Sequence, residues 1–498
     1  MNGLQWNPFS PQQMHLDQFD EHATLRYDDV AAAGPAARPL DFPAPTVYRA
    51  TFVDVPARDH RSGSIHHLNH VLMRTNNGLH ANNSVTNGCS ISKQPATAYL
   101  PIKKLAKSIY GSVKLCIVLK RIENSQTNHC KTPEGRQDYE DDLLGASASS
   151  NSLQWESTDY LVAIKFSEWK RIHQLRGKHL EDPIKECAAL QLVGNYHPHV
   201  IGALEILQDD HCLYTVMPYL GGGDLYGRLL GYVGYRSTGD VGGKGNIGFD
   251  ENLARMWFRQ LLLAVDHLQK KGVCHRDISL ENLILDKDDK LCLVDFGMAL
   301  RVPYTDKYGG GVTDVSAGTS RRLMVSQGQG GKLMYAAPEI IAQQTEVDPF
   351  ATDLWSVGVV LFVMLVGLAP FKWAHPSDKR FASISKGGLK KLVEALDIPI
   401  SAEAIDLLQG FLLADPRQRW TLAEAMQHPW VLGKKFTNRP STFPSTSKNS
   451  AIGAPDMRNT KNRHARKSLS PTKSFRRNNK HASPAECHRN MYLLSSQT

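Results

Sequence analysis

The alternation of apolar and polar residues along the chain starts near residue 98 and stops near residue 432. Residues 98–121, AYLPIKKLAKSIYGSVKLCIVLKR, combine β-branched and apolar residues around one glycine, which predicts two strands joined by a tight turn. A third strand is expected from Tyr160, and the period then becomes helical through residues 184–193, IKECAALQLV. We therefore expect a folded domain that starts near Ala98.

The second half of this domain is predicted to be mostly helical. A strand-like run at residues 211–219 precedes a helical pattern from Glu251 onward, with short strands around residues 283–285 and 291–294. The longest apolar run, Trp355 to Phe371, is at the lower margin of a membrane span, and we interpret it as a buried core helix. The pattern thus indicates an α+β fold with a small, sheet-rich lobe and a larger helical lobe.

Three stretches lack a period that could form a core. Residues 1–97 are rich in Asn, His, Pro, Ser and Ala, and we expect a disordered N-terminal extension. Residues 124–157 are polar, acidic and serine-rich between two strand-like runs, which predicts a loop insertion, either a docking segment or an inert one. Residues 433–498 are basic and rich in Ser and Pro, and we expect a disordered tail.

The net charge of +9 belongs to this tail, because residues 434–498 hold 14 Lys and Arg against 2 Asp and Glu. The rest of the chain has 44 basic and 47 acidic side chains, so it lacks a basic field that would steer it to nucleic acid. We expect no specific nucleic-acid binding and no membrane span. An alternative is that the tail is the primary functional element and binds nucleic acid or acidic membranes, although such segments more often act as import signals or regulatory tails.

The cysteines and the N-terminus indicate the compartment. The eight cysteines show no CxxC pair, which is typical of reduced thiols, and the N-terminal residues lack the basic start and apolar stretch of a signal peptide. We expect a cytoplasmic protein, or a nuclear one if the basic tail acts as an import signal.

Four short motifs follow one another along the domain: VAIK at 162–165, HRDISLEN at 275–282, DFG at 295–297 and APE at 337–339. Phosphoryl transfer needs a cation for the phosphates, oxygen ligands for Mg²⁺ and a carboxylate beside the attacking hydroxyl, and these motifs supply each. Their joint order is a specific signal. Residues 98–432 therefore resemble the eukaryotic protein kinase family of the serine/threonine type, and look most similar to its calcium/calmodulin-dependent and cyclic-nucleotide-dependent members.

The resemblance implies a bilobal protein kinase fold. It implies a small antiparallel-sheet N-lobe with one key helix (98–217, with the insertion 124–157), a larger helical C-lobe (218–432) and an activation segment (295–339). The implied activity is transfer of the ATP γ-phosphoryl group to Ser and Thr hydroxyls of proteins, with ATP and Mg²⁺ as cofactors.

The resemblance also assigns roles position by position. Lys165 is expected to bind the α- and β-phosphates and to pair with Glu186. Asp277 is expected to orient the substrate hydroxyl and accept its proton, while Asn282 and Asp295 hold Mg²⁺. Scaffold roles fall to Asp353, which braces the catalytic loop, and to the pair Glu339 and Arg419. The other implied nucleotide contacts are Ala106, Lys107, Ser108, Ile109, Tyr110, Gly111, Val113, Ala163, Met217, Tyr219, Leu220, Asp224 and Ile284.

Two of these assignments have further implications. Asp224, which follows the glycines of LGGGDL, could equally be the N-cap of the next helix, and the sequence leaves both roles open. Asp224 and Glu281 resemble acidic positions that recognise basic residues near the target Ser or Thr, so a modest preference for basic sites is expected. Arg276 implies regulation by phosphorylation of the activation loop, for which the candidate sites are Ser316, Thr319, Ser320 and Ser326.

The chain departs from the family pattern in the loop that covers the phosphates. The family reads G-x-G-x-x-G-x-V, whereas residues 106–113 read AKSIYGSV, so two glycines are replaced by Ala106 and Ser108. Because Ala and Ser make positive φ costly, we expect a stiffer loop and weaker ATP binding.

The second departure lies in the catalytic loop. Serine/threonine kinases usually carry Lys two residues after the catalytic Asp and a Thr before APE that bonds to it, whereas this chain has Ser279 and Lys332 at these positions. We hypothesise a reciprocal exchange in which Lys332 supplies the ammonium group and Ser279 the hydroxyl. The alternative is that Lys332 faces solvent and the enzyme is slow or inactive.

These departures raise an alternative function, a pseudokinase scaffold with weak or no catalysis. Such decay usually reaches the ionic groups, yet Lys165, Glu186, Asp277, Asn282 and Asp295 are all present. The sequence therefore favours an active enzyme.

Overall fold

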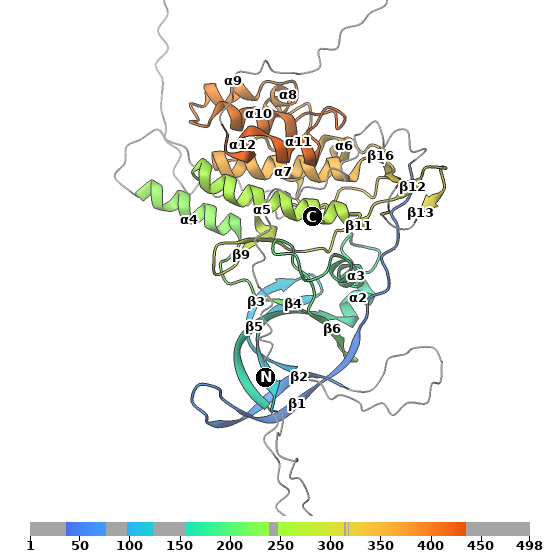
Figure 1. Cartoon of the computed structure of the whole chain (residues 1–498), viewed down its shortest axis with the longest axis vertical. Helices are drawn as coiled ribbons and strands as arrows, with labels where there is room; N and C mark the ends of the chain where they lie inside the picture. The colour runs from blue at the N-terminus through green and yellow to red at the C-terminus, as the bar shows by residue number, and fades with distance from the viewer. Residues whose placement is uncertain are drawn as a thin grey trace, which may run out of the picture. The chain divides into compact units, whose positions relative to one another are not determined.

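The computed structural model describes residues 36–75, 97–122, 155–238, 248–312, 315–316 and 318–434. These residues belong to the first of two units, Met1–Asn438, and the second unit, Arg439–Thr498, lies outside them. A sheet-rich lobe is followed along the chain by a helical lobe, as the α+β prediction requires (Figure 1). The predicted tail lies outside the described residues except for Gly433 and Lys434.

The first lobe is a closed barrel with the strand order β1-β2-β3-β4-β5-β7-β6. Its strand pairs are antiparallel, as predicted, except that β1 runs parallel to β5 and to β6 where it closes the sheet. The strands are β1 (Tyr48–Arg58), β2 (Ile65–Arg74), β3 (Thr97–Ser108), β4 (Gly111–Arg121), β5 (Trp155–Glu168), β6 (Glu205–Gln208) and β7 (Cys212–Pro218).

The hairpin of β1 and β2 corrects the predicted start of the domain at Ala98. Residues 1–97 were expected to be disordered, and this is wrong for residues 48–74, which form two strands of the barrel. In β1 only the small residues Ala50 and Ala57 are buried, and the larger apolar residues that pack on the core, such as Phe52 and Val53, are half-buried and do not alternate regularly with polar ones. Hydrophobic periodicity could not detect a strand of this kind.

The start of β5 also differs from the prediction. Trp155 begins the strand and is buried, so residues 155–157 belong to the barrel and not to the predicted insertion 124–157, and the strand starts before Tyr160. The rest of that insertion, residues 124–154, lies outside the described residues.

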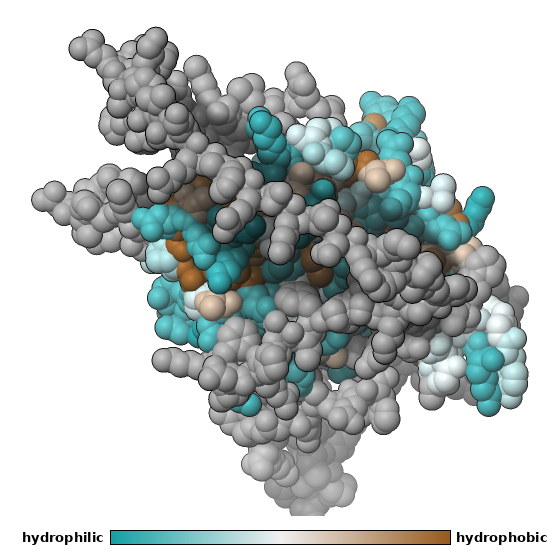
Figure 2. Space-filling view, turned by 90° about the horizontal axis from the view of Figure 1, so that it is seen from above, coloured by the Kyte–Doolittle hydropathy of each residue, from teal (hydrophilic) through white to brown (hydrophobic). Residues whose placement is uncertain are grey.

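One helix is central to the second lobe. Helix α7 (Pro349–Val366) begins at the N-cap Asp348, whose side chain accepts from the Phe350 N–H, and ends at Gly367 with φ +77°. It is long and apolar enough to cross a membrane, but 94% of it is buried inside the protein, so it is a core helix, as predicted. Seen from above, most of the described surface is hydrophilic (Figure 2).

The remaining helices surround α7 and flank the barrel. Helix α3 is the one that reaches the site, and it starts at the N-cap Asp182 with Pro183 as its first residue. The helices are α2 (Trp169–Leu175), α3 (Pro183–Val193), α4 (Leu225–Thr238), α5 (Glu251–Lys270), α6 (Pro338–Ile341), α8 (Lys379–Ile384), α9 (Leu389–Ala395), α10 (Ala402–Phe411), α11 (Leu422–Gln427) and α12 (Pro429–Leu432).

Short strands support the catalytic loop and build the activation segment. In the activation segment β12 pairs with both β13 and β14, and β15 pairs with β16, which follows the segment. These strands are β8 (Val273–Cys274), β9 (Leu283–Leu285), β10 (Leu291–Leu293), β11 (Leu300–Arg301), β12 (Tyr304–Asp306), β13 (Gly311–Val312), β14 (Thr319–Arg321), β15 (Met324–Val325) and β16 (Glu346–Val347).

Candidate active site

An ion pair joins the barrel to helix α3. Lys165 lies on β5, and its Nζ is 2.6 Å from Oε2 of Glu186 on α3, with both side chains almost fully buried. Burial alone would lower the pKa of Lys165, but the carboxylates of Glu186 and Asp295 outweigh it and raise that pKa. The lysine therefore stays protonated beside Asp295, as a phosphate-binding cation must.

The catalytic loop is held by a buried aspartate and closed by an internal amide. Asp353 on α7 accepts the N–H groups of His275 (2.7 Å) and Arg276 (2.8 Å), which confirms its predicted bracing role. Asn282 Nδ2 donates to both the carbonyl and Oδ2 of Asp277, each at 2.8 Å. The Asp277 carboxylate is thereby fixed in orientation, and the amide oxygen of Asn282 is left as an acceptor.

Asp295 lies at the start of the activation segment in a left-handed conformation (φ +67°). Its Oδ1 accepts the Gly297 N–H at 3.2 Å. Burial raises the pKa of Asp295, but Lys165 and the Gly297 N–H outweigh this effect and the pKa is lowered overall. The carboxylate is therefore ionised and can bind a cation.

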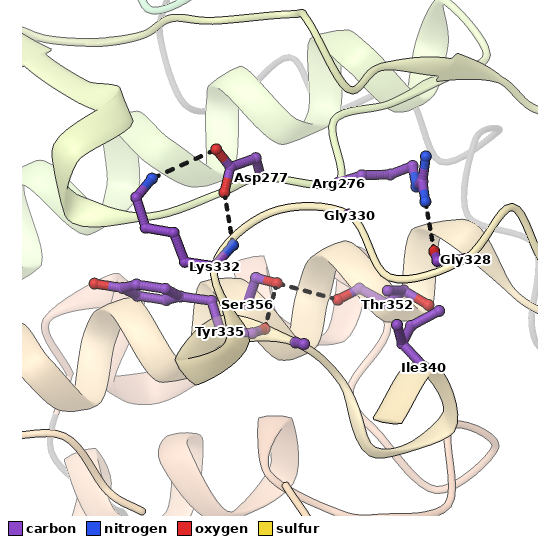
Figure 3. A pocket seen from close by; sticks show the side chains of 10 residues that line it. Arg276, Asp277, Gly328, Gly330, Lys332, Tyr335, Ile340, Thr352 and Ser356 are labelled. Atoms are coloured by element: carbon purple, nitrogen blue, oxygen red, sulfur yellow. Dashed lines mark hydrogen bonds and ion pairs between the residues drawn. The ribbon is translucent and has the colours of Figure 1, made fainter. Parts of the chain in front are cut away.

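Lys332 reaches the catalytic loop from the activation segment (Figure 3). Its Nζ lies 2.9 Å from Ser279 Oγ and 3.4 Å from Asp277 Oδ2, and its backbone N–H donates to Asp277 Oδ1 at 3.2 Å. The structure thus brings together the ammonium, hydroxyl and carboxylate that the exchange hypothesis requires. It contradicts the alternative in which Lys332 points away into solvent.

Sequence reasoning missed the glycine that makes this contact possible. Gly331 has φ +69°, and a Cβ at this position would lie 2.6 Å from Asp277 Oδ1 and 2.7 Å from the Arg276 carbonyl oxygen. Only glycine combines this backbone conformation with so close an approach. The signal in the sequence was the glycine directly before Lys332, which allows the backbone of this segment to approach the catalytic loop.

The strand register shows where the residues expected to line the adenine slot lie, and their contact with adenine stays a prediction. Val113 on β4 is paired with Lys165, and Ala163 on β5 is paired with Met217 on β7. Ile284 on β9 forms a bridge with Asp224. Asp224 Oδ1 accepts the Gly227 N–H at 2.7 Å, so its capping role is present, while contact with a ribose stays a prediction. Tyr219 and Leu220 follow β7 directly, where the two lobes join.

The tip of the hairpin expected to cover the phosphates is an unbroken ladder from Ala106 to Ser108, which follows an irregularity between Lys104 and Ala106. Ala106 pairs with Val113, Lys107 with Ser112 and Ser108 with Gly111, which leaves only Ile109 and Tyr110 in the turn. A Cβ at Gly111 would lie 2.2 Å from the Phe166 carbonyl oxygen, so this glycine is needed for packing on β5. The arrangement agrees with the stiff loop expected from the lost glycines.

Tyr110 does not face the nucleotide. Its side chain is buried in a cluster with Ile172 and Cys187, and its hydroxyl donates to the Glu181 carbonyl at 2.7 Å. The aromatic ring packs against α2 and α3, so the predicted nucleotide contact of Tyr110 is left to its backbone and stays a prediction. Only its backbone can meet a phosphate.

Arg276 and the predicted phosphosites are not in contact with one another. Arg276 Nη2 donates to the Gly328 carbonyl at 2.7 Å, so the guanidinium is hydrogen-bonded to a backbone oxygen of the activation segment (Figure 3). Thr319 and Ser320 lie in β14, Ser316 forms a turn with Thr319, and Ser326 follows β15. Phosphorylation of any of the four stays a prediction.

The second scaffold contact is also present. Arg419 donates to Glu339 through Nη1 (3.0 Å) and Nη2 (3.1 Å), and both side chains are buried. Arg419 Nη1 further donates to the Ala351 carbonyl at 2.6 Å. This bidentate pair ties the APE segment to α7, as predicted.

Comparison with known proteins agrees with this geometry. Residues 143–431 match the family model described as the protein kinase domain. Calcium/calmodulin-dependent protein kinase type 1 of Macrobrachium nipponense is 30% identical over 306 residues, which cover 59% of this chain and 74% of the relative. The kinase cds1 of Schizosaccharomyces pombe is 33% identical over 260 residues (51% and 49%), and kin-29 of Caenorhabditis briggsae is 31% identical over 237 residues (47% and 24%).

The fold and the site define a protein kinase, and the chain belongs to the protein kinase family. Its relatives kin-29 and cds1 are serine/threonine-protein kinases. The matched region spans about a quarter of the length of kin-29 and about half of that of cds1. The family match begins after β4, so the hairpin with the lost glycines lies outside it.

Proposed function

We propose that this chain transfers the γ-phosphoryl group of ATP to Ser and Thr hydroxyls of proteins. The observation that carries the proposal is the assembly of all five ionic or amide groups: Lys165 with Glu186, Asp277 with Asn282, and Asp295 beside Lys165. A scaffold without catalysis has no need to keep two of these pairs at hydrogen-bond distance and a third carboxylate close enough to raise the pKa of Lys165.

The residues present fit ATP and Mg²⁺. The described residues contain no group of three or more His, Cys, Asp or Glu that could hold a metal alone, and Mg²⁺ typically takes one or two carboxylates together with substrate phosphates. Asp295 would hold it through a carboxylate and Asn282 through its amide oxygen, as predicted. Bound there, Mg²⁺ would offset the charge of the phosphates. Ser108 Oγ, buried without a partner in the hairpin above, would suit a phosphate oxygen.

Asp277 and Lys332 would act on the substrate side of the site. Asp277 would orient the attacking hydroxyl and accept its proton, while Lys332 Nζ, 3.4 Å from the same carboxylate, would stabilise the charge on the transferring phosphoryl group. Ser279 would hold the ammonium in place through its hydroxyl at 2.9 Å. We propose that this arrangement performs the task of the lysine that the catalytic loop lacks.

The preferred substrates would carry basic residues near the target hydroxyl. One carboxylate oxygen of Glu281, in the catalytic loop, is buried and accepts no hydrogen bond from the described residues. A buried carboxylate oxygen without a partner favours the approach of a cation. This supports Glu281 more strongly than Asp224, whose Oδ1 is already used by the helix cap.

The proposed role of the tail rests on its charge, and the proposed compartment rests on the absence of a CxxC pair among the eight cysteines. We propose that the protein is cytoplasmic, and that the +12 charge of residues 434–498 makes them a nuclear-import or regulatory segment. Transfer of this tail to a fluorescent protein would test the import role, and fluorescence that stays cytoplasmic would exclude it.

The test of the function is transfer of radiolabelled phosphate from ATP to a serine peptide with basic flanking residues, in the presence of Mg²⁺. Asp277→Asn in the full chain should lower the rate by about a hundred- to ten-thousandfold, because it removes the proton acceptor. Asp288→Asn, at an exposed turn, is the matched control and should leave the rate unchanged. A wild-type rate no higher than that of Asp277→Asn would overturn the proposal.

A further inference from the structure

The segment before the barrel lies against both parts of the site that must be placed correctly for catalysis. Residues 36–47, here called the strap, run from the activation segment past α3 to β1 (the dark blue trace in Figure 1). At its start, the Ala37 N–H donates to the Leu323 carbonyl and the Val325 N–H donates to the Ala37 carbonyl, each at 2.9 Å. The strap thus adds a parallel bridge to β15.

The middle of the strap holds the chain just after the DFG motif. The Leu40 N–H donates to the Arg301 carbonyl at 3.1 Å, and Arg301 Nη1 donates to the Asp41 carbonyl at 2.6 Å. The next residue, Phe42, packs against the core of the helical lobe. The strap is therefore fixed to the activation segment at two places that are far apart in sequence.

The end of the strap holds helix α3. Gln191 on α3 makes two hydrogen bonds with one residue of the strap: it accepts the Thr46 N–H and donates to the Thr46 carbonyl, both at 2.8 Å. Val47 packs on the cluster that includes Cys187, the neighbour of Glu186. The same helix thus binds Lys165 on its inner side and the strap through Gln191.

The composition of the strap suits this role. Pro39, Pro43 and Pro45 restrict its backbone, and the N–H groups of Ala37, Leu40 and Thr46 make the contacts. Because prolines reduce the freedom of the unbound chain, less entropy is lost when the strap binds. A stiff segment also transmits a change at one end to the other.

We propose that residues 36–47 are an intrachain positioning element that holds α3 and the activation segment together in the arrangement required for phosphoryl transfer. Within the described residues, the Arg276 guanidinium donates to the backbone carbonyl of Gly328, and the strap provides a second anchor for the activation segment that needs no phosphate. The effect of the strap on activity rests on the proposed kinase function, whereas its effect on the positions of α3 and the activation segment does not. Gln191 and Ala37 are its positioning residues.

The test uses the full chain with Gln191→Ala at one end of the strap, Ala37→Pro at the other, and the double variant. Lys185→Ala, an exposed residue of the same helix, and Ala44→Pro, at an exposed strap position whose N–H donates to no described group, are the matched controls. Amide hydrogen exchange reports on α3 and on residues 301–325, and phosphate transfer to the serine peptide reports on activity.

We expect Gln191→Ala to speed exchange at residues 301–325, at the far end of the strap, and to lower kcat/KM by about tenfold, the scale of two lost hydrogen bonds. Ala37→Pro should reproduce the loss and speed exchange in α3, and the double variant should lose no more than either single one, because both break one unit. Exchange that changes only around the substituted residue, or losses that multiply in the double variant, would overturn the inference. If the wild type transfers no phosphate, the kinase proposal fails, and the exchange result still decides on the strap.

Discussion

Two lysines of the site bind carboxylates in different ways. Lys165 and Glu186 come from a strand and a helix, form a 2.6 Å contact and expose 11% and 6% of their side chains. Lys332 and Asp277 come from the activation segment and the catalytic loop, are 3.4 Å apart, and Lys332 exposes 39% of its side chain. The first pair is a fixed part of the interior, and the second stays open towards the substrate.

The difference explains why the proposed exchange concerns Lys332 and not Lys165. A buried pair requires both charges, because the loss of one leaves the other without compensation. The second ammonium only has to reach a point near Asp277, and a long flexible side chain can do so from more than one backbone position. Gly331 allows the backbone of the activation segment to come close enough for this.

The largest expected effect comes from breaking the buried pair. Lys165→Met should lower kcat/KM for phosphate transfer by about a thousandfold, because the phosphates lose their cation and Glu186 is left buried without a partner. Lys170→Met, at an exposed position of α2, is the control and should keep full activity. Activity within tenfold of the wild type would mean that Lys165 is not the phosphate-binding cation.

The second prediction restores the usual family pattern, with lysine at position 279 and threonine at position 332. Lys332→Thr and Ser279→Lys should each lower kcat/KM by about a hundredfold, since one removes the ammonium and the other brings a second cation beside it. The double variant should recover to within about tenfold of the wild type. A double variant no better than either single one would refute the exchange, and Lys287→Thr at an exposed turn controls for the loss of a lysine.

A buried pair away from the chemistry should affect stability more than activity. Arg419→Met should lower the free energy of unfolding by about 3–5 kcal/mol, because Glu339 loses a bidentate partner in the interior. Denaturant unfolding measures this change, and kcat at low temperature should fall only slightly. An unchanged unfolding midpoint would show that the pair contributes nothing to the fold, and Arg417→Met, in an exposed contact with Asp415, is the control.

The smallest effect is expected at the hairpin. Ala106→Gly should loosen the ladder with Val113 and lower the KM for ATP by about two- to threefold, because the backbone can then approach the phosphates more closely. Leu105→Gly, at the neighbouring exposed position, separates this effect from a general weakening of β3. Equal KM values for the wild type and Ala106→Gly would count against a cost of the lost glycines.

The contacts that could be predicted from the sequence are those made by charged and polar side chains of the kinase motifs. The roles of Asp353, Glu339 and Arg419 and the meeting of Lys332 with Ser279 followed from residue type and position, and each contact is present. The hairpin of β1 and β2 and the strap were not predicted, because their apolar residues, such as Phe42, Val71 and Leu72, reach the core without a regular period. Backbone groups, such as those of Ala37, make the other contacts. Such contacts leave little hydrophobic pattern.

The closed barrel has a consequence for the time course of synthesis. β1 has two parallel partners: its C-terminal end pairs with β5 about 100 residues later, and its N-terminal end pairs with β6 about 160 residues later, where Tyr48 pairs with Leu207. At a synthesis rate of about 5–20 residues per second, the first strand emerges from the ribosome roughly 10–30 s before the last one can pair with it. During this interval the β1 edge is unpaired and is available to other chains. We therefore expect nascent chains truncated before residue 205 to need chaperones more than the finished protein does.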